Sequence, residues 1–380
     1  IPESLAVPGR LAGVPANLLG IGLTTSPLLW GAGIMIGPRI TIGMLSGSVL
    51  GWIVLGPWLV RGPLHLATDR GAISDWLSWP ATALLVGAAL VYLLRQAGLI
   101  ARAVRDLRSV ASERSVTPVL FAACAALGAL VVGRIVFHLS AWHTGLALLL
   151  SVLGSSICAR SAGLADFAPL GTVGQATQAA YGALAAGRPA VNVAAASVVA
   201  GVPTETCQLL WSLKSGRLLG APVRGQAAAA LLGCVVGTFL CMPAYGLLLS
   251  AYGLASPDLP VPTALQWKAM GEVVAQGLAA LPAGALRAAV VAGLSGIVLA
   301  VIEESPLKRF APPALAVGIG ALLPFDYSLT MFCGAAVVAV STRLGLGPRP
   351  AIAAAAAAGL VAGDSVIGIF VALLRSFGLL

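Results

Sequence analysis

The sequence predicts an all-α polytopic membrane protein with about 9–11 membrane segments, and three observations support this. The mean hydropathy of the chain is +0.98. Only 9% of its residues are charged, against about 25% in globular proteins. Apolar runs as long as a membrane-spanning helix, about 20 residues, recur along the whole chain, and this length favours helices over the shorter strands of a membrane barrel.

Nine apolar segments are predicted to cross the membrane, and two further segments are predicted to be broken. The nine lie at about 40–60, 77–99, 117–139, 144–160, 169–187, 189–212, 226–250, 283–302 and 351–374. The broken segments are 15–37 and 312–342. Residues 312–323 would form a helix of about 18 Å, too short for a ~30 Å hydrocarbon core, and Pro324 then removes a backbone donor. We therefore expect two re-entrant helix-break-helix hairpins.

The two broken segments contain a repeated sequence. Pro15–Gly22 matches Pro313–Gly320 at five of eight positions, with an offset of 298 residues, and a short polar break follows each copy. This predicts a pseudo-repeat architecture of the kind that forms substrate sites near the membrane midplane. The expected division is 1–100 as the C-terminal part of a first repeat, 101–116 as a basic cytoplasmic linker and 117–380 as a second repeat. The helices that would complete the first repeat are expected from an upstream stretch, a second polypeptide or a second protomer.

The distribution of charge predicts orientation rather than nucleic-acid binding. The net charge is +9, but the basic residues are spread over loops such as 101–116 and the loop after residue 212, which we expect on the cytoplasmic side. The segment Thr263–Leu281 separates an apolar from a charged face and is expected to lie in the interface, with Trp267 as its anchor. The six cysteines and three histidines show no metal-ligand spacing, so we expect no metal site, no cofactor and no enzymatic activity.

Ionisable residues inside membrane segments are costly and mark functional sites by default. Glu205 and Gln208 follow Gly201 and Pro203 in an apolar segment. One interpretation is an unwound helix in which Glu205 carries a proton and Gln208 binds substrate. The alternative is a helix end at which Glu205 pairs with a nearby base.

Two aspartates are further candidates for proton coupling. Asp326 follows the Pro324 break, where it could bind a proton or a substrate amino group, or else be a solvated turn residue. Asp364 lies inside the last apolar segment, where a carboxylate can take up and release a proton. In the first break, Ser26 is a candidate substrate ligand.

A polar patch between two apolar segments could recognise the backbone of a substrate or cap a helix. It consists of Asp166, Thr172, Gln175 and Gln178. Gln175 and Gln178 are three residues apart and share one face of a helix.

Several segments together resemble the bacterial branch of the oligopeptide transporter family. They are Ser26–Arg39, Gly51–Pro57, Ala200–Gln208 and Ala362–Ser365, in this order along the chain. The resemblance implies two similar halves, an inner-membrane location in a bacterium and proton-coupled import of small peptides, with metal–chelator complexes as substrates of a plant branch.

The leading hypothesis is therefore a secondary active transporter that couples protons to uptake of small peptides or peptide-like chelates by alternating access. The alternatives are a channel or non-transporting subunit of a membrane assembly, and an intramembrane enzyme. The enzyme is disfavoured because no Ser/His or Asp/Asp pair occurs at helical spacing.

Overall fold

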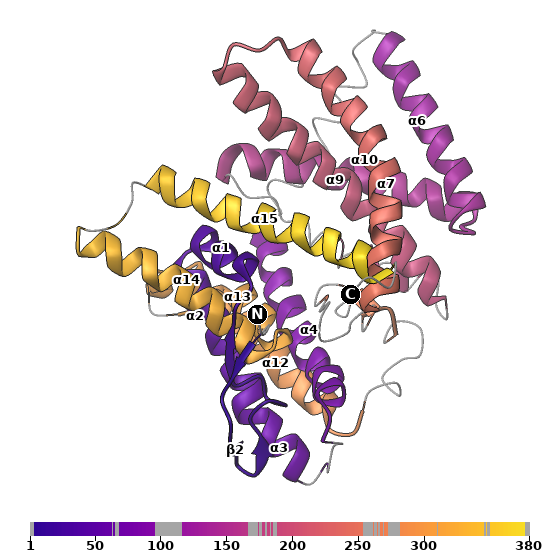
Figure 1. Ribbon diagram of the computed structural model, residues 1–380. Helices are drawn as coiled ribbons and strands as arrows, with labels where there is room; N and C mark the ends of the chain where they lie inside the picture. Colours follow the sequence, from indigo (N-terminus) through magenta and orange to yellow (C-terminus); the bar gives the residue numbers. More distant parts are fainter. Residues whose placement is uncertain are drawn as a thin grey trace. The chain divides into compact units, whose positions relative to one another are not determined.

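The computed structural model is almost entirely helical, and it divides the chain into two compact units (Figure 1). The first unit comprises residues 1–91, 241–266 and 281–380, and the second comprises 92–240 and 267–280. The structure describes residues 4–62, 64, 68–95, 116–165, 174, 177–178, 181–182, 184, 188–253, 261, 264, 267–268, 270–272, 282–309, 311–345, 347 and 350–376.

Six helical segments in the described part of the chain are long and apolar enough to cross a membrane. They are Pro38–Arg61, Pro189–Leu218, Val223–Tyr252, Ala285–Glu303, Phe325–Arg343 and Ala351–Arg375. Each overlaps a segment predicted from the sequence, and the all-α polytopic fold is confirmed. The predicted segment at 169–187 lies mostly outside the described residues, as do the basic loop 101–116 and most of 263–281.

The first unit begins with short strands and then becomes helical. The strands are β1 (Ser4–Ala6), β2 (Arg10–Leu11), β3 (Val14–Pro15) and β4 (Gly22–Thr24), with β1 antiparallel to β4 and β2 antiparallel to β3. The helices are α1 (Pro27–Ile36), α2 (Pro38–Ser48), the π-helix η1 (Val49–Leu55), α3 (Gly56–Arg61), α4 (Arg70–Arg95), α12 (Ala285–Glu303), the 3₁₀ turn η3 (Pro306–Arg309), α13 (Ala314–Leu322), α14 (Phe325–Arg343) and α15 (Pro350–Ser376).

The two copies of the repeat fold differently before their breaks. Residues 312–342 form the predicted helix-break-helix: α13 ends at Leu322, Leu323 and Pro324 are extended, and α14 follows. The expectation of a helix at 15–22 is wrong, because these residues form turns and strands. Asn17, where the second copy has Leu315, accepts a hydrogen bond from the backbone of Leu18 at 3.0 Å, and such local bonds compete with a helix.

Close backbone contacts at glycine hold the first unit together. A Cβ atom on Gly33 of α1 would lie 2.0 Å from the carbonyl oxygen of Met331 on α14. A Cβ on Gly320 of α13 would lie 1.9 Å from the carbonyl oxygen of Met44 on α2. Small residues let helices approach this closely in a membrane, where tight packing replaces the hydrophobic effect as the stabilising term. Gly33 and Met331 are also 298 residues apart, so equivalent positions of the two copies touch each other.

The short helices α1 and α13 have no cap from their own N-terminal residues. Acids from other helices replace these caps. The carboxylate of Asp364 on α15 accepts a hydrogen bond from the backbone N–H of Leu28 at 3.3 Å. Glu303, the last residue of α12, accepts one from the N–H of Ala314 at 3.2 Å. A carboxylate at this position pairs unsatisfied donors and interacts favourably with the helix dipole.

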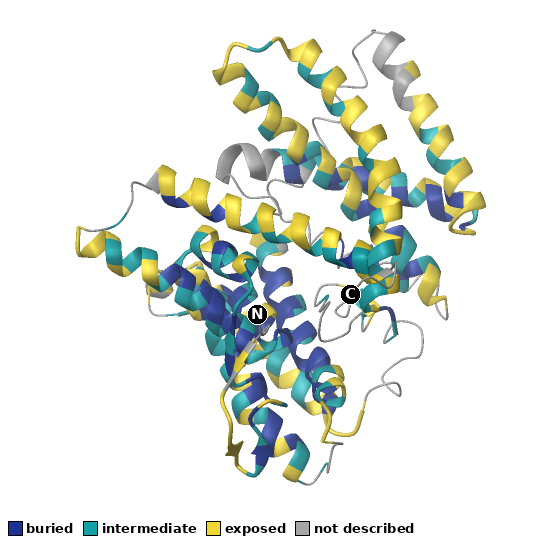
Figure 2. Cartoon of the chain, viewed as in Figure 1, coloured by how far each residue is buried: buried dark blue, intermediate teal, exposed yellow. Residues whose placement is uncertain are grey.

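The second unit contains α6 (Val116–Ile135), α7 (Ala141–Ala165), α9 (Pro189–Leu218) and most of α10 (Val223–Tyr252). Its core is formed by α7, α9 and Tyr181 between them; the fully buried residues are Ala147, Cys158, Tyr181, Ala195, Val199 and Cys207. By contrast, α10 has no buried residue, and its positions are exposed or half-buried (Figure 2).

Candidate functional site

The break between α13 and α14 places a buried carboxylate in a polar environment. Asp326 lies in the first turn of α14 and is only 6% exposed. Its Oδ1 forms a salt bridge of 3.2 Å with Nη2 of Arg70, the first residue of α4. The guanidinium of Arg70 also lies 5.8 Å from the ring of Trp52, within the range of a cation–π contact. Asp326 is therefore paired and buried, not a solvated turn residue.

The two breaks meet in space. The backbone N–H of Thr24, just before the first break, donates to Oγ1 of Thr330 on α14 at 2.9 Å. The Thr330 hydroxyl donates in turn to the carbonyl of Asp326 at 2.7 Å. The Nε1–H of Trp30 donates to the carbonyl of Thr24 at 3.3 Å. These bonds tie the first break to the first turn of α14.

Asp364 is held against the first break. Its Oδ2 accepts a hydrogen bond from the Ser26 hydroxyl at 2.9 Å, besides the one from Leu28. The side chain of Asp364 is half-buried. The structure thus brings together three of the predicted site residues, Ser26, Asp326 and Asp364. With Thr24, Arg70 and Thr330 they form what we call the hairpin-break site.

Some polar atoms around the hairpin-break site have no hydrogen-bond partner. The described part of the first unit buries the hydroxyls of Thr24 and Ser328 and the indole N–H of Trp52 without one. Leaving such a group unpaired costs about 1–3 kcal/mol, which a bound ligand or water would recover. The site therefore has unused capacity for hydrogen bonding.

The second unit holds a separate pair of buried amides. Gln178 and Asn192 are both fully buried. Nε2 of Gln178 donates to the carbonyl of Trp267 at 3.1 Å, and Nδ2 of Asn192 donates to the carbonyl of Gln178 at 2.6 Å. Because each nitrogen faces a carbonyl, the orientation of both amides follows from the bonds. Neither side-chain oxygen has a donor among the groups the structure describes.

The other predicted members of that patch lie outside the described residues: Asp166, Thr172 and Gln175. The ring of Trp267, expected to anchor a helix in the interface, lies against Gly174, where an added Cβ would be 2.7 Å from it. One edge of this indole is therefore packed against its own unit.

Of the two interpretations of the segment around Glu205, the unwound helix is wrong. The helix α9 is continuous from Pro189 to Leu218, with Pro203 inside it. The Thr204 and Thr206 hydroxyls donate to the carbonyls of Ala200 and Val202, both at 2.8 Å, and Pro203 removes only the backbone donor that would face the carbonyl of Val199.

Glu205 itself is exposed on α9, where the Cys234 thiol donates to its Oε2 at 3.8 Å, and Gln208 is also exposed. Within the described ranges, no group of three or more His, Cys, Asp or Glu side chains is arranged to hold a metal ion.

A comparison with protein families decides the identity of this fold. The family model described as "OPT oligopeptide transporter protein" matches residues 3–375. The chain belongs to the OPT oligopeptide transporter family.

Curated OPT relatives match part of the chain. It is 24% identical over 217 residues to the probable metal-nicotianamine transporter YSL12 of Oryza sativa subsp. japonica, covering 55% of this chain and 30% of the relative. It is 22% identical over 254 residues to the probable metal-nicotianamine transporter YSL13 of the same species, covering 65% and 35%. It is 27% identical over 199 residues to the putative oligopeptide transporter YGL114W of Saccharomyces cerevisiae, covering 50% and 27%. These matches span about a third of the length of each relative.

Sequence reasoning missed three residues of this OPT chain. Arg70 stands beside Asp69 at the border of a loop, and nothing in the sequence indicates its partner 256 residues away. Thr330 was missed because a single threonine in an apolar helix does not by itself indicate a functional residue. Asn192 could have been found, because a lone amide in an apolar segment deserves the same attention as an intramembrane acid.

Proposed function

We propose that this OPT chain acts in secondary active transport, importing small peptides or amino-acid-derived metal chelates together with protons by alternating access. The observation that supports this most directly is the hydrogen bonding of Asp364 to the first break. One carboxylate oxygen on α15 accepts bonds from Ser26 and from the N-terminus of α1. A proton on that oxygen would turn an acceptor into a donor, and both bonds would weaken. Proton uptake is thereby linked to the position of the N-terminus of α1.

The Arg70–Asp326 pair suits a substrate that carries both charges. Peptides and amino-acid-derived chelates contain amino and carboxylate groups, and the relatives are named for metal-nicotianamine and oligopeptide transport. A substrate ammonium can replace Arg70 at Asp326, while a substrate carboxylate binds the guanidinium in the bidentate geometry that arginine favours. The charges of the site stay neutralised throughout this exchange, which avoids the large cost of leaving a buried charge unpaired.

The second unit contributes further candidate groups. The free amide oxygens of Gln178 and Asn192 suit the N–H groups of a peptide backbone. Gln208, and the predicted neighbours Asp166, Thr172 and Gln175, stay candidates for substrate binding. Glu205 stays a second candidate for proton coupling. We propose the same inner-membrane location in a bacterium that the family resemblance implies.

Uptake by the full-length protein in proteoliposomes tests this function. The substrates would be a defined di- and tripeptide mixture and an iron–nicotianamine complex, each with and without an inward proton gradient. We expect saturable uptake that a protonophore abolishes. Asp364→Asn should abolish gradient-driven accumulation and leave part of the counterflow exchange, because exchange needs no net proton movement. The matched control is Asp75→Asn, which removes an exposed acid of α4.

Other outcomes would favour the alternatives. Flux that neither saturates nor responds to the gradient would indicate a channel. No flux, in a preparation that binds no substrate, would indicate a non-transporting subunit. Undiminished accumulation by Asp364→Asn would remove Asp364 from the mechanism.

A further inference from the structure

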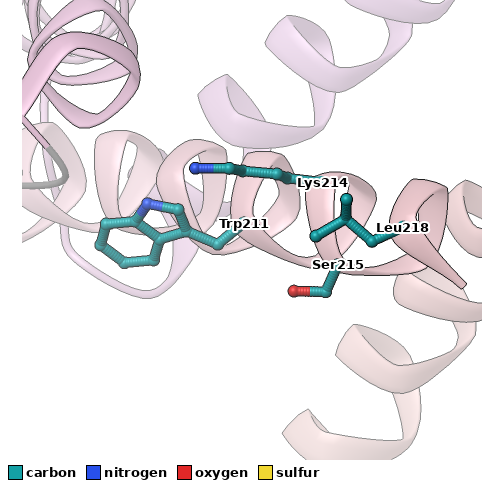
Figure 3. Close-up of a pocket in the computed structure, with 4 residues that line it drawn as sticks. All are labelled: Trp211, Lys214, Ser215 and Leu218. Atoms are coloured by element: carbon teal, nitrogen blue, oxygen red, sulfur yellow. The ribbon is translucent and has the colours of Figure 1, made fainter.

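A pocket lies along the last turns of α9, outside all the groups discussed above. Its volume is about 470 Å³, and the lining residues are Trp211, Lys214, Ser215 and Leu218 (Figure 3). Because these residues are spaced three, four and seven positions apart, they share one face of the helix.

The side chains of this pocket offer hydrogen-bond donors. Lys214 brings an ammonium group, Ser215 a hydroxyl and Trp211 an indole N–H. The indole nitrogen is buried out of reach of a ligand and has no hydrogen-bond partner within the described ranges, so the ammonium and the hydroxyl are the donors open to a ligand. No carboxylate lines the pocket in that part of the structure. A group with negatively charged oxygens would satisfy these donors, and a cation would not.

The surroundings of the pocket are basic and apolar. Between Glu205 and Asp258 the sequence contains Lys214, Arg217 and Arg224 and no acid. These bases stand at the junction of two apolar helices, α9 and α10. Leu218 and Leu219, which end the helix, are 83% and 86% exposed.

The turn between the two helices is well ordered by hydrogen bonds. Gly220 takes a positive φ of 75°, and the N–H of Ala221 donates to the carbonyl of Gly216 at 2.8 Å. Nε2 of Gln226 donates to the carbonyl of Ala221 at 2.9 Å. The basic side chains are thus attached to a fixed backbone at the end of a membrane span, where lysine side chains extend toward the lipid headgroups.

We propose that this pocket binds the phosphate of an anionic phospholipid. Lys214 and Ser215 would hold the phosphate oxygens, and the exposed leucines would contact the glycerol and first acyl carbons. A soluble phosphate ion would bond to the donors but leave the leucines exposed, whereas a phospholipid would also cover the leucines. Basic pockets at the membrane surface bind lipid headgroups in this way. The proposal concerns lipid binding only and does not depend on which substrate is transported.

Native mass spectrometry of the full-length protein, titrated with phosphatidylglycerol or phosphatidylcholine, tests the proposal. We expect phosphatidylglycerol to bind in preference, and Lys214→Ala to weaken that binding about fivefold, the effect of one basic residue near an anionic surface. Lys214→Arg should retain most of it. The matched control is Lys308→Ala, which removes another exposed lysine at a helix end and should change nothing.

A second arm separates a lipid from a free anion. Inorganic phosphate at millimolar concentration should not displace phosphatidylglycerol from the wild-type protein. Displacement would overturn the lipid assignment in favour of a soluble oxyanion, and equal phosphatidylglycerol affinity in wild type and Lys214→Ala would overturn the site itself. If Lys214→Ala does not fold, Lys214→Gln decides the matter, since it keeps most of the length of the side chain and removes the charge: unchanged affinity counts against the site and weaker binding supports it.

Discussion

The two units differ in how their predicted carboxylates are bound. In the first unit, Asp326 and Asp364 are bound by partners from distant parts of the chain, and the helices around them touch backbone to backbone. In the second unit, Glu205 is exposed and the amide oxygens of Gln178 and Asn192 have no described donor. The comparison indicates that the fold holds the carboxylates of the hairpin-break site in place, whereas it leaves Glu205 with one weak contact. The predictions below test this contrast.

The largest effect is expected for Gly33→Ala. The added Cβ would lie 2.0 Å from the backbone oxygen of Met331, which cannot move without separating α1 from α14. We expect the free energy of unfolding to fall by about 3 kcal/mol or more. The matched change Gly233→Ala in α10 meets nothing within 4 Å and should raise it by roughly 0.5–1 kcal/mol through helix propensity. Thermal unfolding of the purified proteins measures both, and effects of the same sign would contradict the difference in packing.

Arg70→Met should come next. It leaves the Asp326 carboxylate buried without its cation, which we expect to cost about 3 kcal/mol. The double variant Arg70→Met/Asp326→Asn removes both charges and should recover most of the lost stability. Chemical denaturation of the three proteins provides the comparison. Equal stability of the single and double variants would show that the salt bridge between Arg70 and Asp326 does not stabilise the break.

A smaller effect is expected for Glu205→Gln. The side chain is exposed and has one weak contact with the Cys234 thiol, so proton-driven uptake should fall by no more than about twofold, the scale of an exposed polar interaction. Asp364→Asn, assayed beside it, should abolish accumulation. The reverse ranking would move proton coupling from the first unit to the second and restore the interpretation that the sequence alone favours.

The smallest effect on stability is expected for Gln178→Met. It removes one bond, to the carbonyl of Trp267, together with an oxygen that has no donor, so the free energy of unfolding should change by less than about 1 kcal/mol. If that oxygen accepts a bond from the substrate, the KM for peptide uptake should rise while the maximal rate is kept. An unchanged KM would make Gln178 a structural residue only.

The contrast also explains which features could be predicted from the sequence. Spans such as 226–250 follow from apolar length alone, and the break at Pro324 follows from a missing backbone donor. The turns at 15–22 were missed because the likeness of the two copies does not show that Asn17, one of three differing positions, bonds to the backbone beside it. The continuity of α9 was missed because one internal proline removes a single backbone hydrogen bond, which a helix of 30 residues can lose without unwinding.

Ser26, Asp326 and Asp364 were identified as candidates because isolated polar residues in apolar sequence are conspicuous. Their partners were not. The pairing of Asp326 with Arg70 spans 256 residues, and that of Ser26 with Asp364 spans 338. Such contacts depend on how the helices cross, which a pattern of hydropathy does not contain.

The π-helix η1 has a consequence for the span from Pro38 to Arg61. Its bonds reach five residues back, as from the N–H of Gly56 to the carbonyl of Gly51, just before Pro57 interrupts the normal pattern. Each turn of η1 therefore holds about one residue more than a turn of the regular α-helix on either side of it. Deleting one residue of η1 would let it close to regular geometry, and because a π-turn spreads one additional residue over about the same rotation, the helix beyond the deletion would keep its facing. Leu59 of α3 would stay buried, so the span should tolerate the loss of the exposed Val54 of η1 but not the replacement of the fully buried Trp52.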